Sequence, residues 1–200
     1  MVFAASPSVN VAIISPTAIY GLSPSIEHPV PLTLPGILNT ISKVPGGFVV
    51  SAGENLQNYV HVLDLARLYV LLVSCAIDAK ELEAGLDLWG PKAYYFGAVE
   101  ELAFADFMAA LVSVLNKKGI VRNETLTSIN VADAAKLHLG GDSQEAPPLD
   151  SWAAHIAIMY GTDMRVRSTR AKKIGWQPRG PAVKDTLDEV VERYLVEKKG

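Results

Sequence analysis

Short hydrophobic runs of the kind typical of β-strands mark the first third of the chain. Residues 9–15 form a nearly continuous run of branched apolar side chains that ends at Pro16, as expected for a strand covered on both faces in a parallel sheet. Residues 48–52 and 58–62 predict two further strands. Between the first two strands, residues 16–35 contain five prolines, which indicates a long irregular loop and a candidate binding loop.

Helical spacing of apolar residues dominates the rest of the sequence. Residues 63–80 contain no proline or glycine and predict a mostly buried helix with Asp64 near its N-terminal end. Residues 183–197 give the clearest amphipathic helix, with charges opposite an apolar stripe. The remaining expected elements are helices at 34–43, 104–117, 131–139 and 149–160, strands at 93–96 and 126–130, and a polar loop at 140–148.

The composition is that of a globular protein and narrows its partners. Half of the 200 residues are hydrophobic, which excludes disorder, and 18 basic against 21 acidic side chains give a net charge of −3. This balance, without a long basic run, argues against nucleic acid or a membrane surface as a partner. The single cysteine, Cys75, cannot form an internal disulfide, and no metal-binding spacing is present. With no secretory signal or membrane-spanning run, we expect a cytoplasmic protein.

Three segments, taken in order, resemble a known enzyme family. Residues 11–21 read VAIISPTAIYG, residues 58–66 read NYVHVLDLA, and residues 170–178 read RAKKIGWQP. They are similar to the apolar strand with its Pro-x-x-x-Tyr-Gly loop, the Tyr-Val-His-Val-Asp-Asp-Leu-Ala segment and the Lys-x-x-Leu-Gly-Trp-x-Pro signature of extended short-chain dehydrogenase/reductases. This is the NAD(P)-dependent epimerase/dehydratase family, and the resemblance spans residues 9–197.

The resemblance implies an α/β fold of which the chain supplies the C-terminal portion. We expect residues 1–80 to be a remnant of the Rossmann half, with incomplete sheet strands, and residues 81–200 to form mainly the small α/β substrate-side lobe. The family uses NAD or NADP, held by an N-terminal Gly-x-x-Gly-x-x-Gly turn, and a catalytic Tyr-x-x-x-Lys pair upstream of the Tyr-Gly loop. The sequence has no such glycine pattern, which argues against cofactor binding by this chain alone.

No catalytic residue is predicted in this chain. Its one Tyr-x-x-x-Lys, at Tyr194 and Lys198, lies in the terminal amphipathic helix, after every other family segment. We expect Tyr194 to pack its ring on the core instead, and Trp176 to be a core anchor. His61 has no acid, nucleophile or metal ligand paired with it in the sequence, so we predict a structural role for it, with Asp64 capping the following helix.

The resemblance also suggests binding residues. The loop after the first strand passes the nicotinamide and the substrate in the family, which gives Pro16, Thr17 and Tyr20 positions near the cofactor; the alternative is that they only end a strand and form a turn. Gln57 and Tyr59 are expected on the substrate side. Nucleotide-sugar members commonly carry an arginine at the position of Gln57, and the loss of that charge favours a smaller carbonyl compound.

Arg165 is the last candidate substrate-binding residue. It opens a basic cluster at residues 165–173 that could hold a substrate phosphate, or could simply be the solvated face of a helix. The function then has two readings. The first is an oxidoreductase acting on a carbonyl, alcohol or sugar-nucleotide substrate, catalytically incomplete as this chain. The second is a non-catalytic binding or interaction module that self-associates through the exposed strand at residues 9–15.

Overall fold

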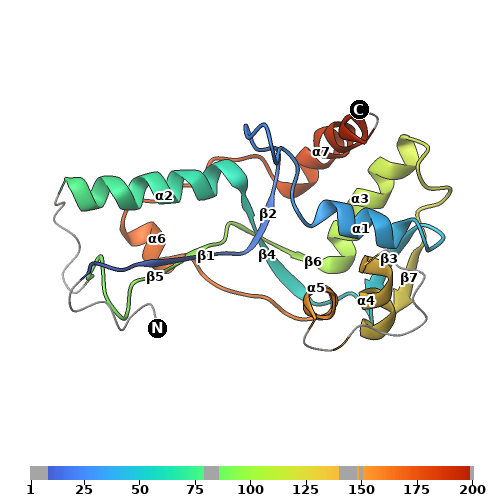
Figure 1. The fold of residues 1–200 in the computed structure, drawn as a ribbon, viewed down its shortest axis with the longest axis horizontal. Helices are drawn as coiled ribbons and strands as arrows, with labels where there is room; N and C mark the ends of the chain where they lie inside the picture. Colours follow the sequence, from blue (N-terminus) through green and yellow to red (C-terminus); the bar gives the residue numbers. More distant parts are fainter. Residues whose placement is uncertain (1–8, 79–85, 140–147, 149–150, 199–200) are drawn as a thin grey trace.

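A computed structural model describes residues 9–78, 86–139, 148 and 151–198. Figure 1 shows its strands and helices in chain order. The elements are β1 (Ile13–Pro16), β2 (Ala18–Tyr20), α1 (Leu34–Ile41), β3 (Gly47–Val50), β4 (Leu56–His61), α2 (Val62–Ile77), β5 (Tyr94–Gly97), β6 (Glu100–Ala103), α3 (Phe104–Lys117), β7 (Leu126–Ile129), α4 (Val131–Leu139), α5 (Trp152–Tyr160), α6 (Thr169–Lys173) and α7 (Val183–Glu197).

The strands form three small sheets that follow one another along the long axis of the molecule (Figure 1). β1 pairs with β5 and β3 pairs with β7, both in parallel. The central sheet has the order β2-β4-β6, in which β2 runs parallel and β6 antiparallel to β4. Because parallel neighbours need crossover connections, helices or long segments separate each pair in the sequence.

Most predicted elements occur within a few residues of their expected bounds, and two strands were not predicted. β2 lies inside the segment expected to be an irregular loop, and β6 has the acidic sequence EELA. Both are held by hydrogen bonds to β4, so their formation depends on a distant strand and not on local preference. The predicted loop at 140–148 lies, apart from residue 148, outside the described residues. No described helix is long and apolar enough to cross a membrane.

The junction between β4 and α2 has no loop. His61 is the N-cap of α2, with extended backbone angles and a ring Nδ1 that accepts a 3.2 Å hydrogen bond from the N–H of Leu63. The prediction that Asp64 is the cap was therefore wrong. Asp64 lies in the first turn, where its buried carboxylate accepts hydrogen bonds from the N–H groups of Arg179 and Gly180 at 2.8 Å each. It ties α2 to the segment before α7.

The prediction of a mostly buried α2 was also wrong. One face is buried against β4 and β5, through Leu65, Leu68 and Leu72. The opposite face is apolar but exposed, and Val70 has 65% of its surface accessible. The other exposed apolar residues of this face are Tyr69, Val73 and Ile77. A continuous apolar pattern predicts burial, yet in this chain nothing among the described residues covers that face.

Two hydrophobic clusters hold the described residues together. The larger lies around α3 and packs α1, β3, β4 and α7 against it, and Tyr194 belongs to it as predicted. The smaller joins α2, β5 and α6 and contains Trp176, which is 3% exposed and confirms the expected anchor. Each cluster draws residues from both sides of residue 80, so the division of the chain at that position stays a prediction.

Candidate substrate-binding site

Two adjoining cavities lie beside the central sheet. The inner cavity has a volume of about 80 Å³ and is enclosed by β2, β4, α3, α5 and α7 together with the start of α1. The outer groove has a volume of about 730 Å³ and runs from the end of β1 past α5. The two spaces share Ile19, Met159 and Met164 among their walls, so the groove adjoins the inner cavity.

All six predicted binding residues line these two spaces. Tyr20, Gln57 and Tyr59 line the inner cavity. Pro16, Thr17 and Arg165 line the outer groove. Parallel pairing of β2 with β4 places Ala18 opposite Tyr59, which is why two segments far apart in the sequence meet here.

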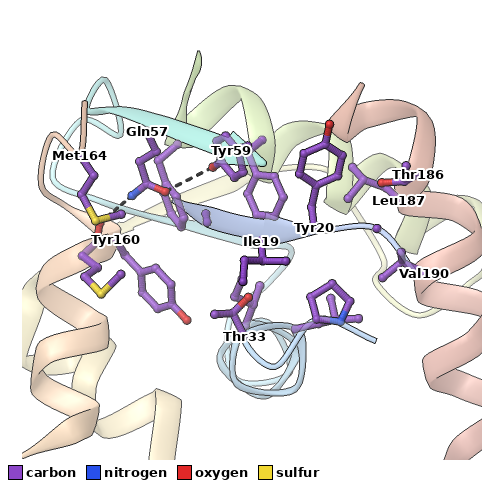
Figure 2. Close-up of a pocket in the computed structure, with 18 of the residues that line it drawn as sticks. Ile19, Tyr20, Thr33, Gln57, Tyr59, Tyr160, Met164, Thr186, Leu187 and Val190 are labelled. Carbon is purple, nitrogen blue, oxygen red and sulfur yellow. Dashed lines mark hydrogen bonds between the residues drawn. The ribbon is translucent and has the colours of Figure 1, made fainter. Parts of the chain in front are cut away.

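Gln57 and Tyr59 are locked to each other. The side-chain amide of Gln57 donates a 2.6 Å hydrogen bond to the carbonyl oxygen of Met159, and its oxygen accepts a 3.3 Å bond from the Tyr59 hydroxyl. Figure 2 shows both bonds at the wall of the inner cavity. Burial, aided by the nearby charge of Glu100, raises the pKa of Tyr59. Both side chains therefore stay neutral, and their polar atoms are already used within the protein.

Tyr20 contributes its ring, and its hydroxyl points away from the cavity (Figure 2). The hydroxyl donates a 2.6 Å hydrogen bond to the carbonyl oxygen of Pro181. The ring meets the His61 ring edge-on, with 5.2 Å between centroids. Burial, with the charges of Glu100 and Asp64, raises the pKa of Tyr20 to about 12. Tyr20 is thus a neutral phenol whose proton is held by the backbone near α7.

Pro16 and Thr17 sit where β1 ends. Pro16 is the last residue of the strand and lies in register with Gly97 of β5. The Thr17 hydroxyl donates a 2.8 Å hydrogen bond to the carbonyl oxygen of Gly97. This bond fixes the start of the loop against the end of β5, at the carboxyl ends of two parallel strands, which is where open α/β sheets commonly bind ligands.

Arg165 is paired with an acidic residue. Its guanidinium forms two hydrogen bonds to the Glu101 carboxylate, at 2.9 and 3.0 Å. These bonds lower the pKa of Glu101 and raise that of Arg165. In the same basic cluster, Arg170 lies over the Tyr95 ring and donates to the carbonyl oxygen of Asp87. A phosphate would have to compete with these partners for either arginine.

A third phenol on the inner cavity, that of Tyr160, was not predicted from the sequence. The Tyr160 hydroxyl lies 3.1 Å from Nδ1 of His138, at the end of α5. Burial raises the pKa of Tyr160 and lowers that of His138, so both are neutral at pH 7. No spacing motif links these residues, because packing of α4 on α5 alone brings them together. The apolar run that predicted α5 was the only available signal.

The described residues do not provide a dinucleotide site. A cofactor pyrophosphate needs a glycine-rich turn between a strand and the N-terminus of a helix. Where helices directly follow strands here, the caps are His61 at α2 and Ala103 at α3, with no glycine at either turn. The described residues also hold no group of histidine, cysteine or acidic side chains suited to a metal ion.

Comparisons with known proteins support the fold. No protein-family model matches the sequence. The curated protein "Oxidase ucsJ" of an Acremonium species is 25% identical over 148 residues, which are 72% of this chain and 38% of that protein. UDP-glucose 4-epimerase from Bifidobacterium longum, solved with NAD⁺ and UDP, has a TM-score of 0.54 at 13% identity over 100% of this chain and 51% of its own.

Two further solved structures agree. UDP-N-acetylglucosamine 4-epimerase from Methanobrevibacter ruminantium has a TM-score of 0.52 at 12% identity, over 97% of this chain and 49% of its own. The dTDP-glucose 4,6-dehydratase DesIV from Streptomyces venezuelae has a TM-score of 0.51 at 14% identity, over 99% of this chain and 48% of its own. The chain spans about half the length of these structures. Its fold is the Rossmann-like α/β fold of NAD-dependent epimerases and dehydratases, as predicted.

Proposed function

We propose that this chain forms the substrate-side part of an oxidoreductase of the epimerase/dehydratase type. Its substrate would be a small carbonyl or alcohol compound, bound in the inner cavity and the outer groove. Pro16 and Thr17 would lie next to the reacting end of that compound, and Tyr20, Gln57 and Tyr59 would form the wall that holds the rest. The chain alone would bind the compound without converting it.

One observation carries this proposal: two of the three segments that resemble the family, residues 11–21 and 58–66, contribute to the walls of the same two adjoining spaces. The loop after β1, residues 57–59 of β4 and helix α5 line these spaces together. The three phenols of the inner cavity, on Tyr20, Tyr59 and Tyr160, each have an internal hydrogen-bond partner and a raised pKa. A general acid works best with a pKa near the working pH, so these groups suit binding better than catalysis.

The dinucleotide that such an oxidoreductase uses would supply hydride transfer, and the residues described here do not fit its pyrophosphate. Solved structures of this fold include an epimerase with bound NAD⁺ and a dehydratase with bound NAD. We therefore assign no step of the reaction to the present residues. Their part is to bind and orient the substrate and to exclude water from its apolar side.

A second candidate function is an interaction module, and the exposed face of α2 favours it. Val70, Val73 and Ile77 lie together on that face, each more than half exposed. Contiguous exposed apolar surface of this kind is more often an interaction site than a helix face that simply lies in solvent. Within the described residues, β1 pairs with β5 along one edge only, which leaves its other edge available to a further strand. Self-association through these two surfaces is the corresponding proposal.

The test of the first function is an assay of the purified chain with NADH and NADPH and a panel of aldehydes, ketones and UDP-glucose. A complete reductase of this fold serves as the positive control. We expect no oxidation of either dinucleotide above background, together with saturable binding of carbonyl compounds in ligand-detected NMR. A rate of NADH or NADPH oxidation that rises in proportion to the protein concentration would contradict the proposal that this chain is catalytically incomplete. Absence of binding across the panel would contradict the substrate-side role.

A further inference from the structure

Most of the surface of the inner cavity is apolar. Ile19, Phe107, Ile156, Leu187 and Val190 line it from four elements, β2, α3, α5 and α7. None of the described residues that line it carries a charge. Figure 2 shows Ile19, Leu187 and Val190 around the space that opens below β2. An apolar ligand gains free energy against such a wall, because its surface leaves water for an apolar environment. An ionic ligand would lose its hydration and would find no opposite charge there.

Most polar side chains of the wall are already hydrogen-bonded within the protein, and the exception is Thr33, whose hydroxyl makes no capping bond at the start of α1. Besides the bonds of Tyr20, Gln57, Tyr59 and Tyr160 described above, the Thr186 hydroxyl donates a 2.9 Å hydrogen bond to the carbonyl oxygen of Val183. A ligand with many hydroxyl groups would lose its hydrogen bonds to water on entering and would find few replacements. A sugar ring is therefore a poor occupant of this cavity.

The described residues that line the two spaces include one lysine or arginine, Arg165, to hold a diphosphate. Gln57 is neutral and bonded at both ends of its amide. Arg165 is hydrogen-bonded to the two oxygens of Glu101 in an exposed pair. A nucleotide sugar would exchange this weak pair at the groove and would still leave its sugar against an apolar wall, so its sugar half fits badly.

We propose that the inner cavity binds the apolar end of an uncharged carbonyl compound, such as an aryl- or alkyl-substituted ketone, and that nucleotide sugars are excluded. This inference rests on the proposed function and names its substrate class. The cavity of about 80 Å³ has room for more than a water molecule and for a short alkyl group or the edge of a ring. The carbonyl end would then lie in the outer groove, toward Thr17.

The experiment is a titration of the whole chain with 4-phenyl-2-butanone and, separately, with UDP-glucose, followed by saturation-transfer NMR. Met159→Glu places a carboxylate on a residue that lines both spaces and is 39% exposed. Val196→Glu is the matched control, because Val196 is 60% exposed on α7 and lines neither space. Ile19→Glu, on the opposite wall and 40% exposed, repeats the test if Met159→Glu does not fold.

We expect the ketone to bind the wild-type chain and the Val196→Glu variant equally, and Met159→Glu to weaken binding about tenfold or more. UDP-glucose should give no saturable signal. Binding of UDP-glucose in place of the ketone would overturn the apolar substrate class and the small substrate, and would leave the substrate-side role of the chain intact. Ketone binding that is unchanged in both cavity variants would overturn the location. Failure of both probes to bind would overturn the inference together with the proposed function.

Discussion

The carboxylate of Asp64 accepts a 2.8 Å hydrogen bond from the backbone N–H of Gly180, and this contact joins α2 to the segment that leads into α7. The approach is so close that a Cβ on Gly180 would lie 2.7 Å from the Cβ of His61. Since α7 supplies Thr186, Leu187 and Val190 to the inner cavity, the Asp64 contacts position one wall of the candidate site.

Replacing Asp64 with asparagine should therefore destabilise the protein. One carboxylate oxygen accepts from Gly180 and the other from Arg179 and Arg67, and an amide nitrogen cannot accept any of these bonds. We expect the free energy of unfolding to fall by about 2 kcal/mol, measured by chemical denaturation. Asp188→Asn is the control, because Asp188 is a mostly exposed partner of Lys118. Equal stability of Asp64→Asn and wild type would contradict the anchoring role.

His61 should make stability depend on pH. Burial lowers its pKa in the folded state, against the opposing charge of Asp64, and its Nδ1 must be unprotonated to cap α2. Because the folded protein binds a proton at His61 less readily than the unfolded chain does, the contribution of His61 to stability is fully present above the unfolded pKa of about 6.5. That contribution is lost as the pH falls from about 6.5 through the lower pKa of the folded state. Thermal unfolding between pH 7.5 and about 5 should show this loss.

The variant His61→Asn isolates that effect, because asparagine is itself a good N-cap and does not titrate. We expect a shallower loss of stability on acidification than in the wild type, with the remainder arising in part from His138, whose pKa burial also lowers. A His61→Asn profile that overlays the wild type would refute the assignment.

His61→Ala should lower the free energy of unfolding by about 1 kcal/mol, because the N-cap of α2 is lost.

Gln57 and Tyr59 should behave as a coupled pair. Tyr59→Phe removes one hydrogen bond and leaves the Gln57 oxygen without that partner, which should cost about 1 kcal/mol. Gln57→Leu should cost about 2 kcal/mol, because the Tyr59 hydroxyl and the Met159 carbonyl both lose a partner. In a double-mutant cycle by urea denaturation, Tyr59→Phe should cost less in the Gln57→Leu background. Strict additivity would show that the bond contributes nothing.

The exposed face of α2 gives a prediction about assembly. If this face drives self-association, the molar mass measured by light scattering should rise with protein concentration, because apolar burial between copies stabilises the larger species. The double variant Val70→Glu and Val73→Glu should shift this equilibrium toward the monomer, and Val196→Glu should not. A wild-type chain that stays monomeric at all concentrations would speak against the interaction-module function.

Sequence reasoning predicted the long elements and failed where distant strands decide the structure. α3 and α7 follow from their periodic apolar stripes, which continue over several turns. β2 and β6 have only three and four residues, and each exists because β4 offers hydrogen bonds to it. The pattern of α2 predicted a mostly buried helix, since a sequence shows how apolar a face is but not whether another element covers it.

The candidate site divides in the same way. Tyr20, Gln57 and Tyr59 could be predicted because short segments around them resemble those of a family, and the structure places them on one cavity. The pairs Tyr160 with His138 and Arg165 with Glu101 could not be predicted. The two residues of each pair come from different segments of the chain, and Glu101 belongs to β6, which was not predicted. Contacts of this kind leave no spacing pattern in the sequence.

Thermal unfolding of the purified chain in the presence of 4-phenyl-2-butanone, NADH or NADPH tests most directly whether the chain has a substrate pocket without a dinucleotide site. A ligand that binds only the native state raises the Tm by mass action. We predict a Tm that rises with the concentration of the ketone and does not change with either dinucleotide. A Tm that rises with NADH or NADPH and is unaffected by the ketone would contradict this assignment.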